Sequence, residues 1–576
     1  MASLRRDPDA APSTGGDRHL GRGLLGAAAG LLAGTAAVAA SEAVTALLAG
    51  VSSPLLSVAN RAVDAAPRPL KEFAISTFGT ADKPVLIGSV IATVAVMAMV
   101  IGYVGLRRPR VAVAAFVLLS LVATAAALTD RSATAGAGIR LIPAITLVVV
   151  GLVALLLLLR PLRTPSAADQ EPGGTHAAAA PTPDSTREPE VGREEVHDNG
   201  KHRLLVGDVL PAHVEGDRLP AAFDRRAFLQ AAVAVGAVAG AGGLVARQFG
   251  GAAATAARAD LSIPGPQVKA PPLPQGAMLD VPGITPYLTP NREFYRVDTA
   301  LRVPDVPIEG WTLRIHGMVD TELELTFEDL LQRRLVESRI TLTCVSNEVG
   351  GEYVGNATWI GVPMKDLLEE AGIQDGADAV LSTSADDFTA GTPLPVLLDE
   401  QRGALVAIAM NGEPLPLEHG FPARMVTPGL YGYVSATKWL VDLEVSRFAD
   451  FKAYWTTRGY SAEAPIKTSS RIDVPRSFER VKSGRTAVAG VAWSQDRGIE
   501  RVEVRIDEDS WQEAELAAED NVNTWRQWVY RWDAEPGSHQ IEVRATDKAG
   551  NTQTAERAPI APDGSTGWHN VNVTVV

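Results

Sequence analysis

Four long apolar segments near the start of the chain constrain its fold more than any other feature. They cover residues 23–48, 84–106, 111–128 and 141–159. Crossing the hydrocarbon core of a bilayer takes about 20 residues of helix, and each segment comes close to that length. Buried helices of a soluble protein would not be so uniformly apolar. We therefore expect residues 1–22 to precede a transmembrane region of four helices at residues 23–160, in contact with a lipid bilayer.

Basic residues alternate with the apolar segments and predict their orientation. They precede the first segment, separate the second from the third and follow the fourth (Arg5, Arg6, Arg18, Arg22, Arg107, Arg108, Arg110, Arg160, Arg163). Cytoplasmic loops carry the excess of Lys and Arg, so residues 1–22 and the end of the fourth helix are expected in the cytoplasm. The loop at residues 51–83 is then outside.

Residues 161–223 are rich in Pro, Ala, Glu and Thr and poor in aromatic side chains, which predicts a disordered cytoplasmic linker. A twin arginine, Arg225-Arg226, then precedes Phe228 and a Gly- and Ala-rich apolar stretch. Residues 224–248 thus resemble a twin-arginine export signal of a bacterial plasma membrane. They equally fit an ordinary fifth transmembrane helix. Both interpretations place a Pro-rich tether at residues 249–286, and everything after it, outside the cytoplasm.

The remainder of the chain is acidic and divides into two predicted domains. The acidic residues of this part outweigh its basic ones and give the whole chain a net charge of −14, which argues against a nucleic-acid binder, since that needs a basic surface. Residues 287–455 mix strand-like runs, such as 311–315 and 405–409, with short amphipathic helices, such as 327–334, and this mixture indicates an α+β domain. Residues 456–576 alternate apolar and polar side chains between turn signals, which predicts an immunoglobulin-like β-sandwich.

Cys344 is the only cysteine among the 576 residues, so the chain can form no internal disulfide. It follows a strand-like run at residues 336–342 and precedes a polar loop that contains Gly350 and Gly351. A side chain at such a strand end can face a ligand. A lone cysteine can also be an inert, buried, small hydrophobe, and its neighbours must decide between the two interpretations.

Residues 289–448 resemble the molybdenum-cofactor domain of the sulfite oxidase family. Six motifs carry the resemblance, in the family's order: Thr289-Pro290-Asn291 with Phe294-Tyr295-Arg296, Cys344-Val345-Ser346-Asn347, Trp359-Ile360-Gly361-Val362-Pro363, Met410-Asn411-Gly412-Glu413-Pro414, His419-Gly420-Phe421-Pro422-Ala423-Arg424 and Lys438-Trp439-Leu440. Gly490-Val491-Ala492-Trp493-Ser494 and Arg497 resemble the family's C-terminal, immunoglobulin-like dimerisation domain, so a homodimer is also implied.

The resemblance implies a molybdenum–molybdopterin cofactor and a set of residues around it. Cys344 would be the protein's ligand to the metal, since molybdenum accepts thiolate sulfur. The implied cofactor-binding residues are Asn291, Tyr295, Arg296, His419, Arg424 and Lys438. Arg and Lys suit the phosphate of the pterin, as a planar fork and as a point charge. Taken alone, His419 would be an ordinary turn histidine.

The substrate side departs from the family. Glu348 and Val349 stand where its sulfite oxidases have arginines, Val297 replaces an arginine upstream and Ile408 replaces a tyrosine. Only Arg497 matches the family's anion-binding arginines, so we take Cys344, Arg497 and Glu348 as the candidate catalytic residues. Glu348 fits two interpretations, a general acid or base beside the metal and a solvated loop glutamate. Sulfite is therefore a doubtful substrate.

We expect the chain to hold no electron-transfer centre besides the molybdenum cofactor. None of the nine histidines and no cysteine lies in a predicted transmembrane segment, so neither a haem nor an iron–sulfur centre is expected. Electrons would pass to an external partner, a cytochrome or a quinone-linked protein. The predicted function is two-electron oxo transfer with a small oxo donor or acceptor as substrate. The alternatives are an S- or N-oxide reductase with the same cofactor, and a cofactor-free binding or sensing domain.

Overall fold

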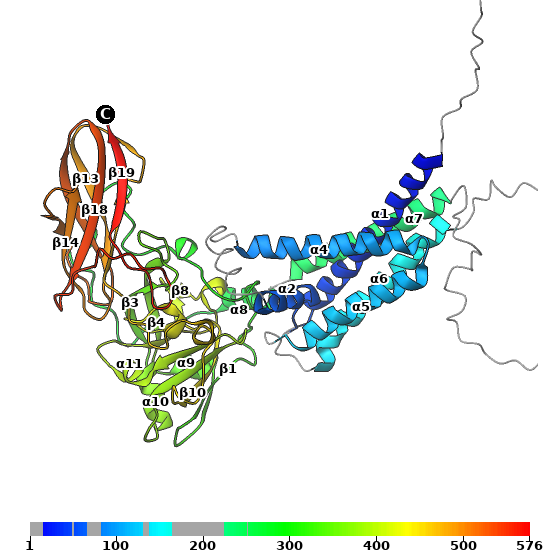
Figure 1. Ribbon diagram of the computed structural model, residues 1–576. Helices are drawn as coiled ribbons and strands as arrows, with labels where there is room; N and C mark the ends of the chain where they lie inside the picture. The colour runs from blue at the N-terminus through cyan, green and yellow to red at the C-terminus, as the bar shows by residue number, and fades with distance from the viewer. Residues whose placement is uncertain (1–14, 49–50, 66–81, 131–136, 164–223, 250–251) are drawn as a thin grey trace, which may run out of the picture. The chain divides into compact units, whose positions relative to one another are not determined.

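The computed structural model describes residues 15–48, 51–65, 82–130, 137–163, 224–249 and 252–576. They form two compact units, a helical unit up to residue 249 and a β-rich unit from residue 252. Most of the linker predicted at residues 161–223 lies outside the described residues. The predicted order of a helical membrane region, an α+β domain and a β-sandwich is confirmed (Figure 1).

The helical unit contains a helix at each of the predicted transmembrane segments. Its helices are α1 (Gly15–Ala46), α2 (Pro54–Ala65), α4 (Asp82–Gly105), α5 (Pro109–Leu128), α6 (Ala137–Arg163) and α7 (Arg225–Phe249). All except α2 are long and apolar enough to cross a membrane. Helix α2 falls in the segment that the sequence assigned to a loop; it has twelve residues and an apolar face, and it packs against α5.

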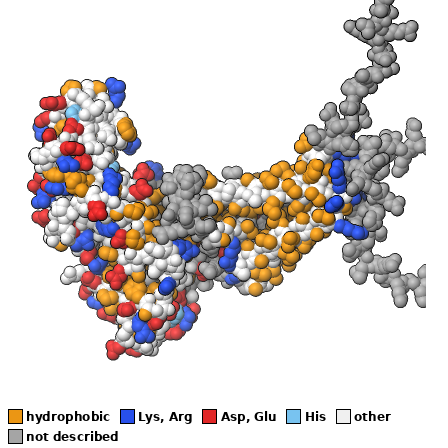
Figure 2. Space-filling model, in the orientation of Figure 1, with side chains coloured by type: hydrophobic (Ala, Val, Ile, Leu, Met, Phe, Trp, Pro, Cys, Tyr) orange, Lys and Arg blue, Asp and Glu red, His pale blue; other side chains and the backbone are white. Residues whose placement is uncertain are grey.

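Small residues let α1 and α4 approach each other closely. A Cβ atom added to Gly102 of α4 would lie 2.2 Å from the carbonyl oxygen of Gly26, and one added to Gly30 of α1 would lie 2.0 Å from that of Ala98. Close backbone contact through small residues is a common way for membrane helices to associate. The outward faces of the helices carry large apolar side chains, seen in orange in Figure 2.

Basic side chains gather at one end of the helical unit (Figure 2). The end of α6 meets the start of α7, since the Asp224 amide donates to the carbonyl of Pro161 at 3.2 Å. The start of the membrane-spanning part of α1 lies beside the end of α4, because Gly23 packs against Tyr103. The arginines around residues 107–110, 160–163 and 225–226 therefore share one end of the unit.

Two sheets form the α+β domain. One has the strand order β2 (Leu323–Thr326), β1 (Thr312–Gly317), β10 (Leu440–Ser446), β5 (Ala379–Ser384) and β6 (Thr389–Pro393). The other has the order β3 (Val336–Thr343), β4 (Val354–Pro363), β7 (Leu405–Met410) and β8 (Glu413–Pro414), with β9 (Arg424–Val426) also pairing β7. Helices α9 (Phe327–Gln332), α10 (Met364–Ala371), α11 (Leu394–Leu398) and α12 (Gly432–Ser435) connect the strands.

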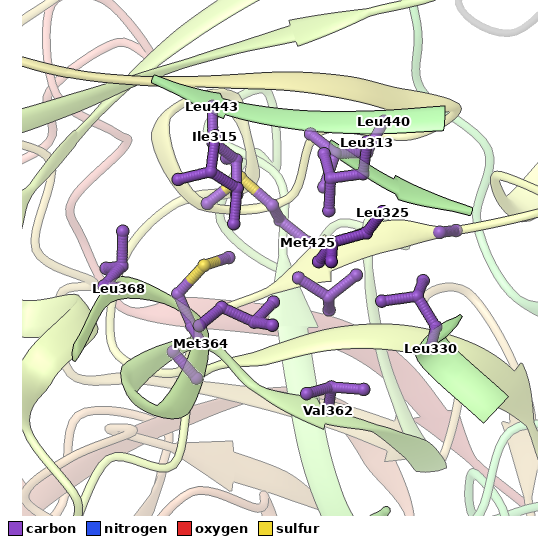
Figure 3. Packing of buried hydrophobic residues seen from close by; sticks show 14 of the residues in the cluster. Leu313, Ile315, Leu325, Leu330, Val362, Met364, Leu368, Met425, Leu440 and Leu443 are labelled. Atoms are coloured by element: carbon purple, nitrogen blue, oxygen red, sulfur yellow. The ribbon is translucent and has the colours of Figure 1, made fainter. Parts of the chain in front are cut away.

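The main core of this domain lies between the two sheets. Leu313 of β1 and Leu443 of β10 face Val362 of β4 and Met425 of β9, with Met364 of α10 beside them (Figure 3). The alternation of apolar residues along β1 and β10 produces this inward face. Ile340 and Leu342 of β3 and Val426 of β9 belong to a second apolar cluster beside this core. That cluster holds the strand ends that carry Cys344 and Arg424.

The C-terminal part is a sandwich of two mainly antiparallel sheets with an apolar core between them. The first has the order β11 (Ser469–Val474), β13 (Gly484–Trp493), β17 (Arg526–Ala534) and β16 (Glu515–Leu516). The second has the order β12 (Arg480–Val481), β19 (His569–Val575), β18 (Gly537–Asp547), β14 (Ile499–Ile506) and β15 (Gln512–Glu513).

The Pro-rich segment at residues 249–286, treated above as a tether, lies along the β-rich unit where it is described. It begins with α8 (Ala252–Asp260), whose Arg258 pairs with Glu413 at 2.9 Å. Val268 then forms a bridge with Val336 of β3, and the Leu279 amide donates to Gln527 of β17 at 2.7 Å. This segment therefore contacts both the α+β domain and the sandwich.

Candidate functional site

Cys344 directly follows the last residue of β3 and is 7% exposed. Its amide donates to the carbonyl of Tyr353 at 2.9 Å, and its Sγ accepts from the Ser346 amide at 3.4 Å. Burial raises the pKa of the thiol, so in the absence of a ligand it is protonated at neutral pH. Among the described residues no cluster of three or more His, Cys, Asp or Glu side chains could hold a metal. A metal at Cys344 must therefore bring its other ligands with it.

His419 is a buried neutral imidazole that lines the same cavity as Cys344, called here the cysteine cavity. It ends the short helix η4 (Leu417–His419) and is 2% exposed. Burial lowers its pKa to about 4. Its Nε2 lies 2.9 Å from the carbonyl oxygen of Asn291, so this nitrogen carries the hydrogen and donates it. The turn of Asn291 (η3, Asn291–Glu293) is thereby linked to the His419 loop.

Arg424, the first residue of β9, is buried without an acidic partner. It donates to the carbonyls of His419 at 3.1 Å, Met425 at 3.2 Å and Ala436 at 3.2 Å, and its guanidinium lies 5.1 Å from the ring centre of Trp359. It forms no ion pair with a described residue, and burial lowers its pKa to about 10. A buried cation without a counter-charge is costly, and this cost is the signature of a site for an anion.

Lys438 is the second buried cation at the site. Its Nζ donates to Asp298 at 2.6 Å and to the carbonyl of Glu418 at 3.1 Å. Burial lowers its pKa to about 8, although Asp298 opposes the shift. Gly420 lies between His419 and Arg424 with φ +110°, and a Cβ there would come within 3.1 Å of both Lys438 and Arg424. The absence of a side chain at Gly420 therefore lets these elements meet.

Asp298 is a site residue that the sequence interpretation missed. Its carboxylate is 5% exposed and accepts from Lys438 and, at 2.8 Å, from Arg296 Nε. The only local signal is that Asp298 follows Arg296 by two residues in an extended segment, which puts both on one face. Arg296, predicted to bind the cofactor, is exposed and donates to this carboxylate. It is not among the residues that line the cavity of Cys344.

One cavity gathers most of the predicted cofactor residues. Its lining includes Cys344, Tyr295, His419, Arg424 and Lys438. Tyr295 stacks on Phe294 with ring centres 5.1 Å apart, and burial raises the pKa of its hydroxyl. Asn291 does not line this cavity; it supports the wall by accepting from His419 and by donating to Glu413 at 2.5 Å.

Arg497 and Glu348 line a different cavity, of about 370 Å³, between the α+β domain and the sandwich. Arg497 Nε donates to Asp547 at 2.8 Å, and its Nη2 donates to the carbonyl of Ile466 at 2.9 Å. Burial would raise the pKa of Asp547, but hydrogen bonds from the Asn551 amide, Arg497 and Thr468 lower it to about 2. The Arg497 charge is therefore opposed by a permanently ionised carboxylate.

The two cavities share the loop that follows Cys344. Val345 and Ser346 line the cysteine cavity, whereas Asn347 and Glu348 line the larger cavity, called here the interdomain cavity. The buried Tyr431 also lines the interdomain cavity. Burial, together with the nearby Asp563 and Cys344, raises the pKa of Tyr431 to about 12. Tyr431 therefore lies close to both cavities.

Comparison with known proteins identifies the family of the α+β domain. Residues 300–455 match the model of the oxidoreductase molybdopterin binding domain. The uncharacterized oxidoreductase YuiH of Bacillus subtilis is 35% identical over 175 residues, which are 30% of this chain and 84% of that protein. The mitochondrial sulfite oxidase of Homo sapiens is 30% identical over 342 residues, covering 50% of this chain and 62% of that protein. The chain belongs to the sulfite oxidase family.

The similarity covers only part of the length of these relatives. The chain spans less than two thirds of the mitochondrial sulfite oxidases, at 62% for both the human and the Macaca fascicularis proteins. Among solved structures, the sulfane dehydrogenase SoxCD from Paracoccus pantotrophus aligns with a TM-score of 0.44 and 23% identity, over 50% of this chain and 81% of that chain.

The residues at the cysteine cavity fit the family's molybdopterin cofactor. Arg424 supplies a buried positive charge without an acidic partner, as a bound phosphate requires. Cys344 supplies one sulfur and leaves the remaining metal ligands to the pterin. The described residues thus place a buried, unpaired guanidinium and a thiol on the same cavity.

Proposed function

We propose that this chain is a membrane-anchored, extracytoplasmic molybdenum oxidoreductase that transfers an oxygen atom to or from a small substrate, with two electrons moving in the opposite direction. The observation that carries the proposal is the cysteine cavity, where Cys344, His419, Lys438 and the unpaired Arg424 share one lining. When bound, the cofactor supplies a metal centre that exchanges oxygen and electrons with the substrate. In the oxidative direction, X + H2O gives XO + 2 H⁺ + 2 e⁻.

The chain's own residues hold and orient the cofactor in this proposal. Cys344 would bind the metal, while Arg424 and Lys438 would hold the phosphate. His419 stays neutral at physiological pH, so it can accept a hydrogen bond from the pterin at Nδ1 while Nε2 donates to Asn291. Tyr295 would close the cavity beside the metal, and the Arg296–Asp298 pair would position Lys438.

Reduction of an S- or N-oxide is the second candidate, and the interdomain cavity favours it. A sulfite oxidase needs free positive charge for a dianion. Here Arg497 is paired with Asp547, and Glu348 adds a negative charge to the same cavity. Both features oppose a dianion and suit a substrate without negative charge. A cofactor-free binding domain is the third candidate, and the unpaired Arg424 counts against it.

The cellular setting follows from the helical unit. We propose a bacterial plasma membrane, with the basic end of the helices in the cytoplasm and the β-rich unit outside it. Five long apolar helices support membrane insertion, and the shared basic end supports a single cytoplasmic side. The proposed partners are an external cytochrome or quinone-linked protein for electrons, and a second copy of the chain through the sandwich. No haem or iron–sulfur centre of its own is proposed.

Metal and pterin content of the purified full chain test the proposal. We expect near-stoichiometric molybdenum by mass spectrometry and an equal amount of oxidised pterin by fluorescence. Arg424→Gln should lose most of both, because it removes the buried positive charge. The matched control is Arg333→Gln, which changes an arginine on the surface that pairs with Glu370. A folded wild-type chain with neither metal nor pterin would contradict the proposal and favour the binding domain.

A further inference from the structure

The interdomain cavity has the size and composition of a small-molecule site. Its volume of about 370 Å³ lies within the range of roughly 300–1,000 Å³ for ligand pockets. One wall comes from the loop after β3 and the other from the sandwich, with hydroxyl and amide groups such as Thr468, Asn551 and Ser565 between them. The site is therefore built by two domains and carries polar groups among its apolar lining.

The charged side chains of this cavity leave an excess of one negative charge. Two cations, Lys467 and Arg497, and three carboxylates, Glu348, Asp547 and Asp563, line it. Lys467 pairs with Asp563 at 2.9 Å, and Arg497 pairs with Asp547 at 2.8 Å. The remaining carboxylate belongs to Glu348, whose side chain forms no ion pair or hydrogen bond with a described residue.

The backbone of the Glu348 loop is held by hydrogen bonds, and the exposed side chain of Glu348 extends from it. Ser565 Oγ donates to the carbonyl of Asn347 at 2.7 Å, and the Tyr353 amide donates to Asn347 Oδ1 at 2.8 Å. The Gly351 amide donates to the carbonyl of Glu348 at 2.8 Å. Glu348 therefore projects from a fixed turn only four residues after Cys344.

We propose that the interdomain cavity binds the positively charged part of the substrate, with Glu348 as its counter-charge. The substrate class is then a small S- or N-oxide that carries an ammonium-type cation. This inference rests on the proposed oxo-transfer function at Cys344. The paired Lys467 and Arg497 offer no free charge to an anion, whereas Glu348 offers one to a cation. The loop at residues 345–348 lines both cavities, so a substrate part held by Glu348 would lie one loop away from Cys344.

Three methyl sulfoxides of similar size test the inference on the full chain, one with a trimethylammonium group, one neutral and one with a carboxylate. Reduced viologen dye supplies the electrons, and R–S(O)–CH3 + 2 H⁺ + 2 e⁻ gives R–S–CH3 + H2O. We expect kcat/KM to fall in the order cationic, neutral, anionic, with about tenfold between the first two, as for a partly enclosed charge pair. Glu348→Gln should remove this preference mainly through KM, and Glu348→Lys should reverse it.

Glu352→Gln is the matched control, since Glu352 is an exposed glutamate near the same loop that does not line the cavity. It should leave the order of the three substrates unchanged. An unchanged order in Glu348→Gln would overturn the inference. A molybdenum-loaded chain that reduces none of the three would overturn it too, while leaving the proposed function in place.

Binding of a product to a metal-free chain tests the inference independently of the proposed oxo-transfer activity. In a Cys344→Ser background, calorimetry would measure binding of the trimethylammonium thioether product. We expect Glu348→Gln to weaken this binding by about tenfold and the carboxylate analogue to bind poorly. Equal binding of the two probes would overturn the inference whether or not the wild-type chain carries molybdenum.

Discussion

At the scale of single residues, burial decides which basic groups at the cysteine cavity carry charge. Arg424 keeps its charge at neutral pH because its pKa falls only to about 10, and His419 loses its charge because its pKa falls to about 4. Lys438 lies between them, with a pKa of about 8. Near neutral pH the cavity therefore holds the unpaired cation of Arg424 and the cation of Lys438 paired with Asp298, and Lys438 loses its charge in mildly alkaline solution.

This difference predicts that cofactor affinity depends on the charge of Lys438. Only the protonated amine attracts a phosphate, and the lowered pKa of Lys438 means that this form is lost as the pH rises through about 8. Rebinding of molybdopterin to the cofactor-free chain should therefore weaken by several-fold between about pH 7 and pH 9. Pterin fluorescence of the protein-bound fraction measures how much molybdopterin has rebound at each pH.

Lys438→Arg provides the comparison, because a guanidinium stays charged over this range. The affinity of the Lys438→Arg variant for molybdopterin should change little between pH 7 and pH 9, whatever its absolute value. The same decline in wild type and Lys438→Arg would show that another group titrates.

At the scale of elements, two strand ends and one short helix form the site. β3 delivers Cys344, β9 delivers Arg424, and η4 delivers His419. Leu342, Val426 and Leu417 of these elements pack in one apolar cluster, and Met425 of β9 also enters the core in Figure 3. The motifs around these residues could be found in the sequence because the chemistry of the cofactor dictates both the residue types and their spacing. Their convergence on one cavity is what the structure adds.

Interactions between distant segments explain what the sequence could not show. From the sequence, Arg497 resembles a free anion-binding arginine, but its partner Asp547 lies fifty residues away. Asp298 pairs with Lys438 across 140 residues. Helix α2 was missed because a short amphipathic helix among mixed charges resembles a loop when only long apolar runs are sought.

The contact of α1 with α4 predicts a sharp effect of side-chain size. Gly102→Leu places atoms where the backbone of Gly26 and Gly30 already lies, and overpacking of this kind costs about 1–3 kcal/mol or more. The midpoint of thermal aggregation in detergent should fall. Gly88→Leu, in the same helix, is the control, since a Cβ there meets nothing within 4 Å. Equal midpoints for the two variants would mean that the helices are not packed in this way.

At the scale of the whole molecule, the proposed export of the β-rich unit depends on Arg225 and Arg226 at the start of α7. Asp224 caps α7 by accepting from the Ala227 amide at 2.9 Å, so Arg225 and Arg226 begin the helix at the basic end of the unit. In the proposed function a folded domain holds the cofactor, so the cofactor would have to enter before that domain is exported. A route for folded domains therefore suits this chain better than threading of an unfolded one.

Replacing Arg225 and Arg226 together by Lys distinguishes such a route from insertion of an ordinary fifth helix. The substitution keeps both positive charges, so orientation by charge alone predicts that the β-rich unit still reaches the outside. A signal that is recognised through its arginines predicts instead that the unit stays in the cytoplasm. We expect the second outcome, measured as protection of the β-rich unit from protease added to bacterial spheroplasts. Arg160 and Arg163 changed to Lys form the control, because they lie at the same end but outside the pattern. Protease access equal to that of wild type in the Arg225/Arg226 variant would show that α7 is oriented by its charge and inserted like the other helices.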